Sequence, residues 1–195
     1  MEALSDGVFA IAATLLVLEI DLPLHGTPLE RALNAWPGYL AYIASFLTIG
    51  AAWLTHSALT DRLTRADPLF LRINLVLLLV VAFLPFPTRV AAEALHSGNG
   101  ERVFVTMYGL TLLAIRALVF ALDEYASREQ LYVRDSETDE SRIEGRKLLS
   151  VLIGYAIAIL VGLALPRLAA AFYFGIAIYL IVPFRKVARL LFGRS

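Results

Sequence analysis

Long, nearly continuous apolar runs dominate the chain, and short polar stretches separate them. A helix needs roughly 20 mostly apolar residues to cross the hydrocarbon core of a bilayer. Helices are expected rather than strands, because the runs do not alternate and backbone exposed to lipid must be hydrogen-bonded within its own segment. Six runs approach the required length: 3–20, 37–59, 69–95, 102–122, 147–165 and 168–184. The pattern predicts an all-α, polytopic membrane protein with six transmembrane helices.

Turn-forming and polar residues mark the boundaries between these runs. Residues 97–100 (Ser-Gly-Asn-Gly) separate the third run from the fourth. Pro85 and Pro87 lie inside the third run and should kink it or end its regular part. The longest polar stretch, 123–146, is interpreted as a solvated connector. No internal repeat is evident, so we expect a single unit over residues 1–195.

Composition agrees with a membrane protein and excludes several other classes. Apolar residues make up 59% of the chain and charged residues 17%, whereas soluble domains carry about 25% charge. The formal net charge is zero, so no global field points to a nucleic-acid partner. The chain has no cysteine and three scattered histidines, and it lacks common phosphate-binding and hydrolase motifs. We therefore expect neither an enzyme nor a resident metal or cofactor.

Basic residues are distributed unevenly between the two sides of the predicted helices. An even number of helices places both termini on one side, and cytoplasmic loops carry the excess of basic residues. The side of the termini carries eleven basic residues and the other side four: Arg62, Arg65, Arg128, Arg134, Arg142, Arg146, Lys147, Arg185, Lys186, Arg189 and Arg194 against Arg31, Arg89, Arg102 and Arg167. Both termini should be cytoplasmic. Only two of the 17 basic residues are lysines, which we interpret as the codon bias of a bacterium and hence a bacterial cell membrane.

Helical periodicity divides the first run into two faces. At about 100° per residue, one arc of roughly a quarter-turn holds Ile11, Thr14, Leu15 and Leu18. The opposite side holds Phe9, Ala13, Leu16 and Ile20. We call Ile11, Leu15 and Leu18 the apolar stripe. Ser5 and Asp6 point away from it, and Glu19 and Asp21 straddle it near the far end of the helix.

Residues 4–20 resemble the first helix of the transmembrane protein 175 family, which comprises lysosomal potassium channels and their prokaryotic homologues. The hallmark of that family is Arg, three residues, then Phe-Ser-Asp. Ser5 and Asp6 match its end, Leu4 replaces the Phe, and the Arg position falls before Met1. Further likeness lies in Trp53-Leu-Thr-His56, in Asn74 and in Pro85-Phe-Pro-Thr88.

The resemblance implies a potassium-selective cation channel in which four copies of one six-helix unit surround a pore lined by the first helix. Permeant K⁺, the lipid bilayer and further copies of the chain are the expected partners. The large aliphatic residues that narrow the pore in the family match Ile11, Leu15 and Leu18. A hydroxyl that contributes to selectivity matches Thr14, although a threonine in a helix also commonly bonds back to its own backbone.

The resemblance also implies a structural role for the polar residues near the start of the first helix. Hydrogen bonds would join Ser5 and Asp6 to a set on later helices: Trp53, His56 and Asn74. Two further interpretations come from the residues alone. Glu19 and Asp21 either concentrate cations at the pore mouth by a focused field or are ordinary solvated charges. Arg116, midway along the fourth run, is expected in a buried structural pair.

Two other functions are compatible with a polytopic membrane protein. A secondary transporter usually has paired broken helices and repeated halves, and neither pattern is visible here. A membrane scaffold or sensor could act through the 123–146 connector. Unitary currents would separate a channel from both.

Overall fold

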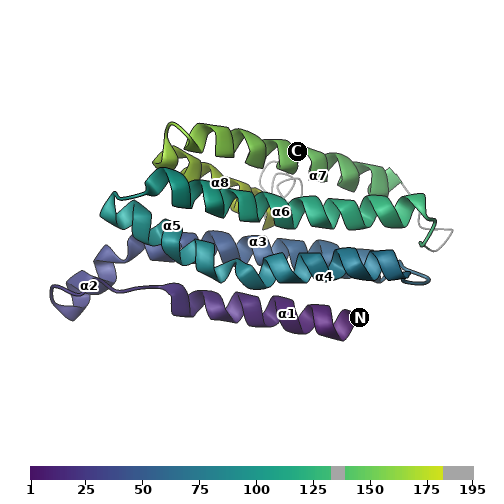
Figure 1. The fold of residues 1–195 in the computed structure, drawn as a ribbon, viewed down its shortest axis with the longest axis horizontal. Coiled ribbons are helices and arrows are strands. Elements are labelled where there is room, and N and C mark those ends of the chain that lie inside the picture. The colour runs from purple at the N-terminus through teal and green to yellow at the C-terminus, as the bar shows by residue number, and fades with distance from the viewer. Residues whose placement is uncertain (133–138, 182–195) are drawn as a thin grey trace, which may run out of the picture.

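The computed structural model describes the backbone of residues 1–132 and 139–181, and the side chains of this part except those of residues 139–148. The helices lie side by side in an elongated bundle (Figure 1). Outside the helices, Leu63 and Tyr132 form an isolated β-bridge. In chain order the elements are α1 (Glu2–Leu15), η1 (Leu16–Glu19), α2 (Pro28–Asn34), α3 (Trp36–Thr60), α4 (Pro68–Phe83), α5 (Pro85–Ser97), α6 (Glu101–Arg128), α7 (Asp139–Gly162) and α8 (Pro166–Ile181).

The first apolar run forms one helical rod that changes its winding before it ends. The α-helical part stops at Leu15, and η1 continues it as a turn of 3₁₀-helix. A 3₁₀-helix has three residues per turn and a steeper rise than an α-helix. Ile20 then takes an extended conformation. The rod therefore ends just before Asp21.

The hydrophobic pattern does not predict α2, a short helix between the first two long ones. Its start is a capping box: the Glu30 amide donates to the Thr27 hydroxyl, and the Thr27 amide donates to the Glu30 carboxylate. These bonds, above all the one from the Thr27 backbone, hold the pKa of the Glu30 carboxyl below its usual value. The Arg31 Nε donates to the Pro23 carbonyl at 2.6 Å and folds the preceding loop onto α2.

The third apolar run forms two helices, α4 and α5, as its prolines predict. Pro85 and Pro87 have no amide hydrogen and cannot continue the α-helical ladder. The helix therefore breaks at Leu84. The Leu84 carbonyl accepts hydrogen bonds from the amide and the hydroxyl of Thr88, which restarts regular helix beyond the prolines.

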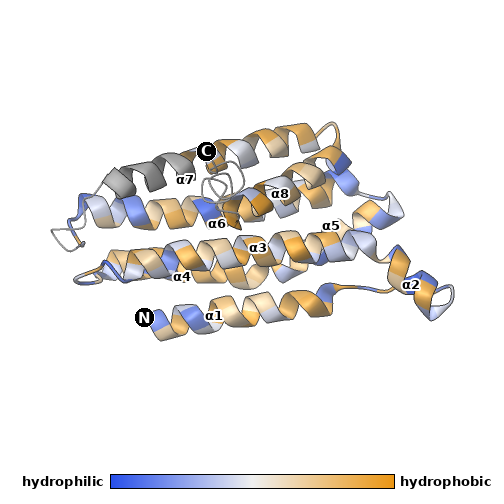
Figure 2. Ribbon diagram, turned by 180° about the vertical axis from the view of Figure 1, so that it is seen from behind, coloured by the Kyte–Doolittle hydropathy of each residue, from blue (hydrophilic) through white to orange (hydrophobic). Residues whose placement is uncertain are grey.

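Length and hydropathy identify several helices as membrane spans. Among the described residues, three stretches are long and apolar enough to cross a bilayer: α3, the α4–α5 run Pro68–Ser97, and α6. The apolar helices Leu149–Gly162 and Pro166–Ile181 are shorter. Figure 2 shows hydrophobic residues along the middle of the long helices and hydrophilic residues at the N-terminus. The protein is thus an all-α membrane protein.

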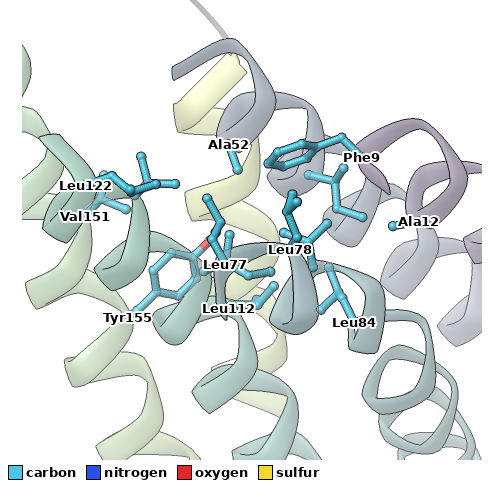
Figure 3. Packing of buried hydrophobic residues seen from close by; sticks show 14 of the residues in the cluster. Phe9, Ala12, Ala52, Leu77, Leu78, Leu84, Leu112, Leu122, Val151 and Tyr155 are labelled. Atoms are coloured by element: carbon cyan, nitrogen blue, oxygen red, sulfur yellow. The ribbon is translucent and has the colours of Figure 1, made fainter. Parts of the chain in front are cut away.

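The buried apolar residues form a cluster that joins α1 to the far side of the bundle. Figure 3 shows it extending from Phe9 and Ala12 on α1 to Val151 and Tyr155 on α7. The N-terminus and the α3–α4 loop lie at one end of the bundle, whereas α2 and the α5–α6 turn lie at the other (Figure 1). Consecutive long helices therefore run in alternating directions.

Candidate functional site

The first helix has one buried face and one face that no described residue covers. Phe9 is 2% exposed and Leu16 is 0% exposed, because both pack into the core cluster, where α1 contacts α3 and α4 and η1 contacts α3 and α5. By contrast, Ile11 is 60% exposed and Leu18 is 73% exposed. Aliphatic side chains rarely remain this exposed on the surface of a finished assembly unless lipid or another protein covers them.

The exposed face contains the whole apolar stripe. Leu15 is exposed together with Ile11 and Leu18. A Cβ added at Gly7, one turn before Ile11, would meet nothing within 4 Å. The helix therefore offers an open surface from its first turns to η1, and the roles of the stripe residues in a pore stay predictions at this point.

Thr14 lies on the same exposed face, between Ile11 and Leu15. Its hydroxyl donates to the Ile11 carbonyl at 2.9 Å, the back-bonded arrangement common for threonine in helices. A hydroxyl oxygen that donates its proton still has lone pairs to offer. The bond therefore fixes the rotamer of Thr14 and leaves the oxygen able to coordinate a cation.

A hydrogen-bonded polar network anchors the start of α1 to α3 and α4. The Asn74 Nδ2 donates to the Ser5 hydroxyl at 3.1 Å, and the Asn74 Oδ1 lies 2.8 Å from the His56 Nε2. Because Asn74 uses its carbonyl oxygen there, His56 Nε2 is the donor. The Trp53 Nε1 donates to the Asp6 carboxylate at 2.9 Å.

The structure thus joins the five residues of the predicted structural network in two hydrogen-bonded groups, Ser5–Asn74–His56 and Asp6–Trp53. Ser5, His56 and Asn74 are buried, whereas Asp6 is exposed. Phe9 packs against the His56 ring with centroids 5.5 Å apart. These contacts reach α1 from one side only, so they set which way the opposite, unpartnered face points.

The two acidic residues at the far end of the rod have different surroundings. The Asp21 carboxylate accepts from the Arg89 Nε of α5 at 2.8 Å, in an ion pair that remains about half exposed. Glu19 has no polar partner in the described part of the chain, and it lines a pocket of about 150 Å³ together with Asp21, Arg89, Glu93 and His96. Sequence patterns alone do not reveal the Asp21–Arg89 pair.

The expectation of a buried ion pair at Arg116 is wrong for the described residues. Arg116 is 1% exposed in the middle of α6, yet none of the described carboxylates lies within ion-pair distance. In the described part of the chain it makes one hydrogen bond, a long one of 3.5 Å from Nη2 to the Thr48 carbonyl. Its acidic neighbours on α6 lie near the helix ends, beyond the reach of the side chain.

Comparison with known proteins gives a consistent result. A family model described as "Endosomal/lysosomal potassium channel TMEM175" matches residues 1–85. The chain is 36% identical over 167 residues to "Potassium channel B446_29190" of Streptomyces collinus, a match that covers 84% of this chain and 81% of the relative. It is also 37% identical over 112 residues to "Endosomal/lysosomal proton channel TMEM175" of Gallus gallus, but spans only 22% of that protein.

Among solved structures, the fold is similar to the crystal structure of a lysosomal potassium-selective channel TMEM175 homolog from Chamaesiphon minutus. The TM-score is 0.82 at 33% sequence identity, and the match covers 92% of this chain and 93% of that chain. The likeness therefore extends well beyond the first three apolar runs.

Proposed function

The chain belongs to the TMEM175 family of ion channels, and we propose that it conducts potassium through a pore formed by four copies of its first helix. The family consists of channels rather than enzymes, and bacterial relatives bear the name potassium channel. The finer points of the proposal are the tetramer, the pore-lining face and the narrow rings along it.

The observation that carries the proposal is the uncovered apolar stripe on a helix that is otherwise packed. Ile11 and Leu18 are exposed, while Phe9 and Leu16 on the same rod are buried. One helix cannot enclose a path for ions. Four copies related by a four-fold axis would turn each stripe residue into a ring and cover the exposed face with neighbouring copies.

Six crossings of the membrane give the subunit its topology. The three long spans supply three crossings, and the α1–η1 rod and the apolar helices α7 and α8 supply the others. The first helix can cross with an uncharged middle because its charges, Glu2, Asp6 and Glu19, lie toward its ends. With eleven basic residues on the side of the termini against four, both termini lie in the cytoplasm of a bacterium.

The stripe supports a conduction mechanism based on dehydration. A narrow apolar ring offers a hydrated ion no replacement for the water that it sheds, so such rings gate by dewetting. Potassium holds its water less tightly than sodium and would pass with the smaller penalty. The Thr14 oxygens, between the Ile11 and Leu15 levels, would return part of the lost coordination.

The polar network would keep the stripe aimed at the axis. Hydrogen bonds to Ser5 and Asp6 hold the first turns of α1 against α3 and α4. A rotation of the helix by one residue, about 100°, would break them. We therefore assign these residues to positioning of the helix and not to ion binding.

The proposal is tested by recording purified protein in planar bilayers under potassium–sodium gradients. Wild-type protein should pass unitary currents, which a transporter or a scaffold does not, and its reversal potential should favour potassium. Ile11→Ala should raise conductance and lower the potassium-to-sodium permeability ratio several-fold, because it widens an apolar ring. Thr14→Ala should lower the ratio with a smaller rise in conductance.

The matched control is Leu79→Ala, which removes the same kind of exposed aliphatic side chain from α4. It should leave the reversal potential unchanged. A shift with Leu79→Ala and none with Ile11→Ala would refute the assigned pore face. Native mass measurement in detergent should give four chains per particle, and a stable monomer that still conducts would refute the tetrameric pore.

A further inference from the structure

Arg116 places a charge in the interior of the subunit, away from the proposed pore. It lies on α6, near the middle of a helix that is long and apolar enough to cross a membrane. Its side chain is 1% exposed. An ionisable side chain at this depth is costly, and it normally has a partner of opposite charge.

The polar contacts of Arg116 are few. A guanidinium has five N–H donors, and one of them makes a long bond, 3.5 Å, to the Thr48 carbonyl of α3. The Nε is buried and has no acceptor. No carboxylate of the described chain pairs with it. Within the described residues, the charge therefore has no counter-charge and the Nε has no acceptor.

The neighbouring polar groups are neutral hydroxyls, which can donate or accept a hydrogen bond but carry no negative charge. The Tyr155 hydroxyl of α7 lies toward Thr48 and interacts electrostatically with Arg116, yet it forms no hydrogen bond of normal geometry. The Thr48 hydroxyl already donates to the Ala44 carbonyl at 2.8 Å. The Tyr173 hydroxyl, on the next ring along at a centroid distance of 6.2 Å from Tyr155, is also buried without a partner.

Among the residues that the structure describes, what this part of the interior lacks is a group with negative charge. Buried polar groups are almost always hydrogen-bonded, and a buried charge without a counter-charge is far more costly than a neutral group. A water molecule could accept hydrogen bonds but would leave the charge of Arg116 unbalanced. A small monovalent anion would satisfy both requirements.

We propose that the subunit binds a chloride ion between α3, α6 and α7, held by the Arg116 Nε and the Tyr155 hydroxyl. The inference goes beyond potassium conduction, since these residues face the interior behind α3 and not the exposed stripe of α1. Both ligands donate hydrogen bonds, which is the chemistry that a halide requires. The site does not depend on the pore assignment, and a measurement of stability tests it.

The test compares the thermal midpoint of the purified full-length channel in potassium chloride and in potassium gluconate at equal ionic strength. A ligand that binds only the folded state raises the midpoint in a concentration-dependent way. Chloride should raise it by several degrees and saturate, whereas gluconate is too large to enter. Arg116→Gln should abolish the difference between the two salts, and Tyr155→Phe should shift saturation to higher chloride.

Arg89→Gln is the matched control. It removes an exposed arginine that already pairs with Asp21, and it should keep the full response to chloride. Crystals of wild-type protein grown with bromide in place of chloride show the anion directly through its anomalous scattering. This measurement tests the site even when Arg116→Gln fails to fold. We expect one anomalous difference peak per subunit beside Arg116. Equal midpoints in the two salts, or density at Arg116 that is water without an anomalous signal, would overturn the proposal.

Discussion

Ile11 on α1 and Arg116 on α6 both lie mid-helix in surroundings that the described residues leave incomplete, but what is missing differs between them. Around Ile11 the polar groups of α1 are hydrogen-bonded to α3 and α4, and an apolar face is uncovered. Near Arg116 on α6, Leu112, Ile115 and Val119 are fully buried, whereas the Arg116 Nε and the Tyr155 hydroxyl have no hydrogen-bond partner in the described part of the chain.

The difference indicates what completes each region. An uncovered apolar face needs a large apolar surface to pack against, and another copy of the chain or lipid supplies that surface. A buried positive charge with free N–H donors requires instead a small, negatively charged hydrogen-bond acceptor next to it. The subunit therefore points to two additions of different kinds, further copies at α1 and an anion behind α3, and substitutions in each region should respond differently.

The sharpest contrast on stability is between two leucines of the same 3₁₀ turn. Leu16→Ala should lower the free energy of unfolding by about 3 kcal/mol, because it opens a cavity in the core. Leu18→Ala should change the stability of the isolated subunit little, since its side chain is mostly exposed. Unfolding in detergent, followed by thermal midpoint, measures both. Equal losses of stability in the two variants would mean that Leu16 and Leu18 do not differ in burial as the structure shows.

A glycine tests how completely the α6–α8 region is packed. A Cβ at Gly109 would overlap the Tyr173 hydroxyl oxygen, so Gly109→Ala should destabilise the protein by about 2 kcal/mol through overpacking. Gly50→Ala is the control, because its Cβ would meet nothing within 4 Å and alanine favours a helix. The thermal midpoint should fall for the first variant and hold or rise for the second.

Asn74 is the centre of the polar network on the α1 side. Asn74→Ala should cost about 1 kcal/mol, since hydrogen bonds inside membrane proteins average about 0.6 kcal/mol each and the change removes two. The channel should also lose tetramer yield while the surviving channels keep their reversal potential. Asn34→Ala, at the exposed end of α2, should do neither. An altered ion preference with Asn74→Ala would contradict a purely positioning role.

The smallest expected effect concerns Glu19 and Asp21, the two carboxylates at the end of the first apolar run. Glu19→Gln should lower potassium conductance modestly at low salt and hardly at all at high salt, because salt screens exposed charge. Asp21→Asn removes a negative charge and also leaves the positive charge of Arg89 unpaired. It should therefore lower potassium conductance more than the double variant Asp21→Asn/Arg89→Gln does. Single-channel recordings at two ionic strengths decide this, and salt-independent losses would contradict action through the field.

Features that depend on local chemistry can be predicted from the sequence. The two faces of the first helix follow from its periodicity, and the helix break follows from Pro85 and Pro87. The α2 helix also had a local signal, Thr27-Pro28 followed by Glu30, which is the start of a capping box, but its seven residues are too few for a hydrophobic pattern to reveal.

Pairings between distant residues need the fold. Asp21 and Arg89 are 68 residues apart, and nothing near either one indicates the other. The resemblance to a family supplied the pairs of the polar network, since spacing along the chain does not relate Asp6 to Trp53. The prediction for Arg116 was wrong for a physical reason. A buried charge requires a counter-charge, and we expected a carboxylate of the same chain to provide it.

The 3₁₀ winding of η1 affects the length of the barrier that an ion would meet. Side chains three residues apart eclipse one another in a 3₁₀-helix, and three residues rise about 6 Å. Leu18 therefore stands almost directly above Leu15 instead of being displaced around the rod. In the proposed pore, the two leucine rings would merge into one continuous dry stretch. An ion would have no wet resting point between them and would have to cross both in a single step.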